Sequence, residues 1–174
     1  MPHNDIWEKY KSRITGGWKC ISFEMFSPTG ELLSKPHGDK PLGRVLISPQ
    51  GFLSAHIARL DRMGPLPSGK AWQVGEDAEV AFVARGMSMY CGYFTLGEDE
   101  EGLFWETEVE VCSDPARFGG KEFRRLEFVQ EGGRELLVLR PKQDLIMEVS
   151  LGFSCSLGSA CVCWGDANAG LGWH

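Results

Sequence analysis

The sequence predicts a mainly β protein: an antiparallel β-barrel with a short N-terminal helix and one mid-chain helix. Two observations carry this prediction. Residues 103–112 alternate between an apolar face and a glutamate-rich face, which is the period of a half-buried strand. Similar short runs recur along the chain between turns rich in glycine and proline, a spacing typical of all-β folds. We therefore expect one domain over residues 1–174, with an atypical tail from about residue 150.

Composition narrows the classes of partner. The 174 residues carry a formal net charge of −6 at pH 7, which disfavours nucleic acid or an anionic membrane surface as the main partner. No apolar run approaches the roughly 18 residues of a membrane helix. The N-terminal residues lack the apolar core of a secretory signal, so we expect a cytoplasmic protein.

The cysteines are expected to be free thiols. There are six of them, and the cytoplasm keeps thiols reduced. The spacing of Cys155, Cys161 and Cys163 lacks the second ligand pair of a zinc site, so no metal is expected.

The N-terminal third is predicted to hold one helix and three strands. Ile6, Tyr10 and Ile14 lie four residues apart on one face, so residues 4–14 are expected to form a helix that plugs one end of the barrel. Gly- and Pro-containing turns then separate short apolar runs, which predict hairpins. The expected strands cover residues 18–26, 44–48 and 52–60.

A second helix is predicted in the middle of the chain. A loop with several glycines and prolines covers residues 63–73, and an apolar stripe at helical spacing follows it. The stripe consists of Val80, Val83, Ala84 and Met87. It predicts a helix over residues 76–90, which leads into a strand over residues 90–96.

The second half of the chain is predicted to continue as strands. Trp105 and Thr107 share the apolar face of residues 103–112, and we expect this face to point inward. The opposite face carries Glu106 and Glu108, which are costly to bury and are therefore expected in solvent rather than as an acid–base pair. Further strands are expected over residues 121–130, 135–140 and 144–153.

Several short motifs occur in the order in which a known family carries them. They are Gly16-x-Trp18, turns at Gly30 and Gly51, Pro41-x-Gly43, Ser54-Ala55, Arg59-x-x-Arg62, Met89-Tyr90-Cys91-Gly92-Tyr93, Ser113-Asp114-Pro115, Gly119 and Arg124. From about Ile6 to Leu139 the chain resembles the lipocalin-like domain family of small bacterial and fungal proteins. The resemblance implies a small β-barrel with an internal pocket, and fungal relatives include cofactor-free cyclases and isomerases of natural-product pathways. Relatives often carry a histidine at the position of Thr107, so histidine-dependent chemistry is in doubt for this chain.

Inward polar side chains are the candidates for a site. Arg124 shares a strand face with Leu126 and Phe128, and an inward guanidinium needs an anion, a carbonyl or a carboxylate. The alternative is a structural arginine tied to a carboxylate such as Glu24. Tyr90 is placed near it by the family-like motif alone.

Two further candidates depend on strand alternation. Glu24 alternates in phase with Trp18, which the family resemblance points inward at the closed end, so Glu24 lies either in the pocket or at its rim. His56 stands on the third strand and titrates near neutral pH, with a satisfied or solvent-facing histidine as the alternative.

Two functional hypotheses stay open at this point. The first is a cofactor-independent cyclase or isomerase acting on an apolar biosynthetic intermediate, in which Arg124, Tyr90 and His56 hydrogen-bond a carbonyl or enolate. The second is a non-catalytic binding protein or carrier for a small apolar metabolite, anchored by the same residues. A third hypothesis is a scaffold that forms a homodimer, because large side chains stand on both faces of the predicted strands. The expected substrate-binding residues are Trp105, Thr107, Glu24, Arg59 and Phe128, with no metal and no organic cofactor.

Overall fold

The structure is a computed structural model that describes residues 5–27, 29–141, 145–149, 153–157 and 160–166, the last three ranges as strands with their pairing. Its helices and turns are α1 (Asp5–Ile14), η1 (Leu60–Arg62), η2 (Trp72–Val74), α2 (Asp77–Ala84) and η3 (Pro115–Arg117). Its strands are β1 (Gly16–Phe26), β2 (Leu32–Ser34), β3 (Leu42–Ile47), β4 (Phe52–Ala58), β5 (Met87–Asp99), β6 (Gly102–Cys112), β7 (Lys121–Glu131), β8 (Arg134–Pro141), β9 (Leu145–Val149), β10 (Phe153–Leu157) and β11 (Ala160–Asp166).

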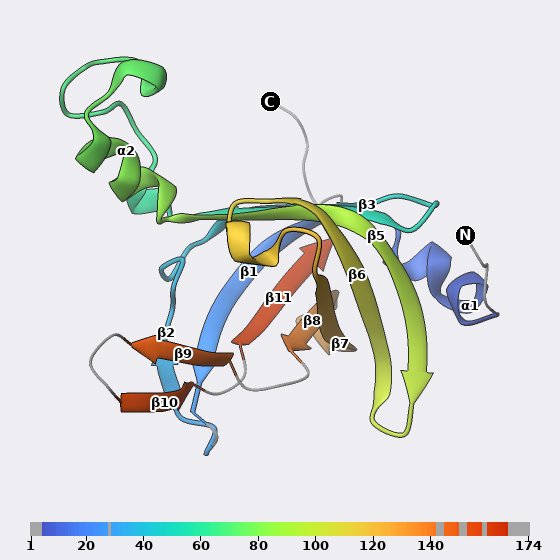
Figure 1. Cartoon of the computed structure of the whole chain (residues 1–174). Coiled ribbons are helices and arrows are strands. Elements are labelled where there is room, and N and C mark those ends of the chain that lie inside the picture. Colours follow the sequence, from blue (N-terminus) through green and yellow to red (C-terminus); the bar gives the residue numbers. More distant parts are fainter. Residues whose placement is uncertain (1–4, 28, 142–144, 150–152, 158–159, 167–174) are drawn as a thin grey trace.

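The predicted antiparallel barrel is confirmed. In the described part of the chain, the barrel consists of β1, β3 to β8 and β11. Each strand of this set pairs with the next member of the set in chain order. The ring closes because β11 also pairs with β1. β2 attaches to the end of β1, and β9 and β10 form a separate hairpin (Figure 1). Closure leaves no long free sheet edge in the ring.

Helix α1 covers one end of the ring, as predicted (Figure 1). Trp7 packs edge-on against Phe94 of β5 with ring centroids 5.5 Å apart. Ile14 is completely buried, and its carbonyl oxygen accepts a hydrogen bond of 2.9 Å from Nε1 of Trp18. Trp18 is therefore buried at the closed end, where it links the helix to β1.

The mid-chain helix is shorter than predicted. It ends at Ala84, and the expected helical residues 87–90 instead begin β5, where they pair with β4. Gly86 separates the two elements, and an added Cβ there would lie 2.7 Å from Cδ of Arg62. Because pairing with β4 satisfies the backbone of these residues and partly buries their side chains, it overrides the local helical periodicity. No residue of α2 is buried, and the helix stands clear of the barrel (Figure 1).

The last barrel strand lies later in the chain than predicted. Residues 144–153 were expected to supply it, but residues 145–149 belong to the β9–β10 hairpin. The ring is closed by β11, which lies in the Gly- and Cys-rich tail. Pairing on both edges satisfies the backbone of this strand, and composition alone does not reveal such pairing. Within the described residues, no helix is long and apolar enough to cross a membrane.

Two bulges reverse the inward and outward faces of their strands. In β1, Cys20 and Ser22 oppose consecutive residues of β11, so Ile21 is an extra residue. Phe23 then shares the face of Trp18, and Glu24 takes the opposite face. In β6, Glu110 is the extra residue, since Val109 and Val111 oppose consecutive residues of β5.

Candidate functional site

The inward face of β5, β6 and β7 is packed with buried side chains near α1 and carries partly exposed charged side chains at the other end. Near α1 it is fully packed: Trp105 is completely buried and tilts against Phe94 at 5.2 Å. In the register of β6 and β7, Trp105 lies opposite Arg124 and Thr107 lies opposite Glu122. Both pairs share the inward face, yet Glu122 and Arg124 keep 17% and 24% of their side chains exposed. The end away from α1 is therefore open to solvent.

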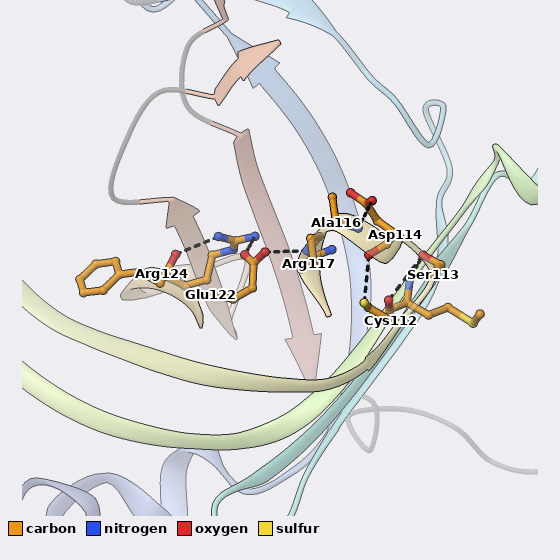
Figure 2. Close-up of polar contacts among 9 residues, drawn as sticks. Cys112, Ser113, Asp114, Ala116, Arg117, Glu122 and Arg124 are labelled. Atoms are coloured by element: carbon orange, nitrogen blue, oxygen red, sulfur yellow. Dashed lines mark hydrogen bonds and ion pairs between the residues drawn. The ribbon is translucent and has the colours of Figure 1, made fainter. Parts of the chain in front are cut away.

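A cluster of charged side chains occupies this open half. Glu122 lies between two arginines and uses one carboxylate oxygen for each (Figure 2). Its Oε1 accepts from Nε of Arg117 at 2.5 Å, and its Oε2 is 2.7 Å from Nη2 of Arg124. Nη1 of Arg124 donates to the carbonyl oxygen of Phe123 at 2.8 Å. The cluster thus fixes both guanidinium groups, and we call it the Arg–Glu–Arg cluster.

The loop between β6 and β7 brings Arg117 into the cluster. Asp114 accepts a hydrogen bond from the backbone N–H of Ala116 at 3.1 Å, which caps the start of the η3 turn that ends at Arg117. Gly119 adopts φ +70°, a left-handed conformation that favours glycine, and returns the chain to β7. The guanidinium carbon of Arg117 lies 4.6 Å from the ring centroid of Tyr90.

Tyr90 is held in its protonated form. Burial raises the pKa of its phenol above the ordinary value of 10.0, and the negative charge of Glu122 raises it further. The positive charges of Arg124 and Arg117 offset only part of this increase in pKa. At neutral pH the phenol is therefore a hydrogen-bond donor that lies beside the two arginines.

Three buried polar atoms near the cluster have no hydrogen-bond partner in the part of the chain that the structure describes. They are Nε1 of Trp105, Oγ1 of Thr107 and Nη2 of Arg117. Trp105 and Thr107 are both completely buried. A buried polar group without a partner costs about 1–3 kcal/mol, so its retention calls for an explanation. A ligand that hydrogen-bonds to any of these atoms would supply a missing partner.

Four of the predicted site residues come together. Tyr90, Trp105, Thr107 and Arg124 share the inward face of three neighbouring strands. Arg124 does pair with a carboxylate, as in the alternative of a structural arginine, but that carboxylate is Glu122 and not Glu24, which was named as an example.

The other four predicted site residues lie elsewhere. His56 is exposed on the outward face of β4, where its Nε2 lies 2.9 Å from Oγ of Ser54. The β1 bulge turns Glu24 away from the face of Trp18, and its carboxylate lies 3.4 Å from Nζ of Lys35.

Arg59 and Phe128 are separated from the cluster by their own contacts. Arg59 forms an ion pair of 2.7 Å with Asp61 at the start of the β4–β5 connection. Phe128 lies beneath α1, where Tyr10 stacks on its ring at 6.4 Å and the guanidinium carbon of Arg13 lies 3.8 Å from its centroid. Its position at the closed end gives it a role in packing.

Sequence reasoning missed Arg117 and Glu122. Glu122 stands two residues before Arg124 on the same strand, so alternation places the two side chains on one face and could have found it. Arg117 lies in a loop, where no periodicity indicates a direction. Among the described residues, no group of three His, Cys, Asp or Glu side chains is placed to hold a metal ion. The side chains of Cys155, Cys161 and Cys163 lie outside the described part.

His37 is a second residue that the sequence did not single out. It lies between β2 and β3, is 7% exposed, and packs edge-on against Phe23 at 4.9 Å. Burial lowers its pKa below the ordinary value of 6.5, the charge of Arg59 lowers it further, and a hydrogen bond with the Gly86 backbone partly opposes this. Its ring is therefore neutral at neutral pH.

We expect His37 to make the protein sensitive to acid. As pH falls through about 6.5, the unfolded chain binds a proton at this residue and the folded chain does not, so the free energy of unfolding decreases. Urea unfolding at pH 7.5 and 5.5 measures the decrease, and His37→Phe should make it smaller. His56→Phe, on the exposed outer face, is the control and should keep the wild-type decrease. An equal decrease in wild type and His37→Phe would contradict this assignment.

Two hollows lie outside the barrel, on the connection between β4 and β5. They measure about 440 and 340 Å³ and share walls from Met63, Leu66 and Val83. Phe82 lines the first and Trp72 the second, and both side chains are about half exposed. The Arg–Glu–Arg cluster and the unpartnered polar atoms of the barrel do not line these hollows.

Comparison with known proteins agrees with this architecture. A family model described as a lipocalin-like domain matches residues 15–159. The chain belongs to the lipocalin-like domain family, which confirms the resemblance of its motifs and points to a ligand-binding barrel. The match spans β1 to β10 and stops just before β11. A search of curated proteins and a search of solved structures each gave no match to the chain.

Proposed function

We propose that the barrel binds one small, mainly apolar molecule whose oxygen-bearing group reaches Thr107, Trp105 and the Arg–Glu–Arg cluster. The observation that carries this proposal is the set of three buried, unpartnered polar atoms on the inward side of the barrel. Eight-stranded barrels of the lipocalin type hold one small ligand in their interior. Apolar walls with a few convergent polar groups are the usual composition of such sites.

Thr107→Val should separate binding from stability. Replacing the unpartnered hydroxyl with a methyl group removes a buried polar cost, so the free energy of unfolding should stay equal or increase. Binding of Nile red, a neutral apolar dye with a ring carbonyl, should weaken by about fivefold to tenfold because one hydrogen bond is lost. Dye fluorescence measures binding, and urea unfolding measures stability.

The matched control is Thr95→Val. Thr95 is exposed on the outward face of β5, so its replacement should leave dye affinity unchanged. The absence of saturable one-to-one binding to the wild-type protein would contradict the proposal. Equal affinity of the wild type and Thr107→Val would contradict the assigned position, as would a loss of binding in Phe82→Ser on the outer hollow.

A second candidate is cofactor-independent isomerisation or cyclisation of the bound molecule. Tyr90, kept protonated beside Arg117 and Arg124, favours it. Fixed donors of this kind stabilise negative charge that develops on a carbonyl oxygen as an enolate forms. Analysis of the pathway product with and without the protein separates the two candidates, since only a catalyst changes the product formed.

A further inference from the structure

The Arg–Glu–Arg cluster carries more positive than negative charge. Its charged members in the described structure are Arg117, Glu122 and Arg124, so two cations face one carboxylate. Their side chains are 21%, 17% and 24% exposed, which leaves each group partly shielded from water. The neighbouring Tyr90 adds no negative charge while its phenol stays protonated. An excess of positive charge among these described residues, at a partly shielded site, attracts an anion.

The hydrogen bonds of the cluster show which arginine can receive that anion. Each oxygen of Glu122 already serves one guanidinium. Arg124 uses Nη2 for Glu122 and Nη1 for the carbonyl oxygen of Phe123. Arg117 uses Nε for Glu122, whereas its Nη2 is buried and has no partner among the described residues. Among the described residues of the cluster, Nη2 of Arg117 is thus the buried nitrogen that has no partner.

The position of Arg117 is also fixed before a ligand arrives. Its guanidinium is held by Glu122 on one side and by the ring of Tyr90, at 4.6 Å, on the other (Figure 2 shows the Glu122 contact). A preorganised guanidinium binds an oxyanion without losing further side-chain freedom. Its charge-assisted hydrogen bonds are about twice as strong as those between neutral groups.

We infer that the ligand is an apolar carboxylic acid in its anionic form, and that Arg117 selects it by binding the carboxylate. This inference rests on the proposed binding function of the barrel. A neutral carbonyl would satisfy Nη2 of Arg117 but would leave the excess positive charge in place. A carboxylate satisfies the donor and neutralises the charge at once. The second carboxylate oxygen would face Oγ1 of Thr107, and the apolar body would extend along the rest of the inward face.

The test compares two probes that share one acyl chain, the anion decanoate and its neutral methyl ester, by displacement of Nile red at pH 7.5. The wild-type protein should bind decanoate at least about tenfold more tightly than the ester, the effect expected of a charged hydrogen bond. Arg117→Gln should remove this preference, so that acid and ester bind to the variant with equal affinity within about twofold. The control is Arg140→Gln, which removes the same charge from β8 at a side chain that is 48% exposed. This variant should keep the preference for decanoate.

Each outcome separates the inference from the proposed function. If the wild-type protein binds acid and ester equally tightly, the inference is overturned, whereas the proposed binding of an apolar molecule stands. This comparison uses the wild-type protein alone. Retention of the preference in Arg117→Gln would overturn the role of Arg117. Displacement of the dye by neither probe would overturn the inference, while failure of the dye itself to bind would overturn the proposed function.

Discussion

Replacing Trp18 with Ala is expected to lower the free energy of unfolding by about 3–5 kcal/mol, the usual cost of removing a large aromatic side chain from a core. Trp18 is 5% exposed and lies at the closed end of the barrel. Its Nε1 donates to the carbonyl oxygen of Ile14, so the substitution also removes a contact between α1 and β1. Urea unfolding followed by circular dichroism measures the loss.

Trp72 provides a matched control for this experiment. It is the same residue type, but it lies on the β4–β5 connection and is 44% exposed. Trp72→Ala should change the free energy of unfolding by less than about 1 kcal/mol, as surface substitutions usually do. An unchanged unfolding midpoint in Trp18→Ala would show that this tryptophan does not anchor the closed end.

Glu122→Gln is expected to have the second largest effect, a loss of about 2–4 kcal/mol. The substitution leaves Arg117 and Arg124 facing each other without their shared carboxylate. Breaking a fully buried ion pair costs about 3–5 kcal/mol, and the remaining exposure of these side chains reduces that cost. Thermal and urea unfolding of the variant measure the loss.

Two further variants test the cause of this loss. Glu127→Gln breaks a pair with Arg140 whose side chains are 53% and 48% exposed, so it should cost less than about 1 kcal/mol. Adding Arg117→Gln to Glu122→Gln should recover part of the loss, because one of the two unbalanced charges is removed. A double variant less stable than Glu122→Gln alone would show that charge imbalance is not the cause.

The main architecture was accessible from the sequence because it depends on local patterns. Alternation in residues 103–112 correctly placed Trp105 and Thr107 inward, since burial of the opposite glutamates is costly. Turns at Gly30 and Gly51 separate neighbouring strands, and both glycines adopt positive φ. Such signals act within a few residues of the chain.

The parts that could not be predicted depend on partners distant in the sequence. A bulge at Ile21 is defined only by the register against β11, and it reverses the direction expected for Glu24. The closing strand itself is recognisable only through its pairing with β1 and β8. Arg117 reaches the site from a loop, and the end of α2 is decided by pairing of residues 87–90 with β4.

A crystal structure of the protein saturated with decanoate or methyl decanoate, whichever binds more tightly, tests the central claim most directly. The account predicts ligand density inside the barrel, with an oxygen of the ligand within hydrogen-bonding distance of Oγ1 of Thr107 or Nη2 of Arg117. Ligand density confined to the outer hollows beside Met63 and Phe82, with the barrel interior empty of ligand, would contradict it.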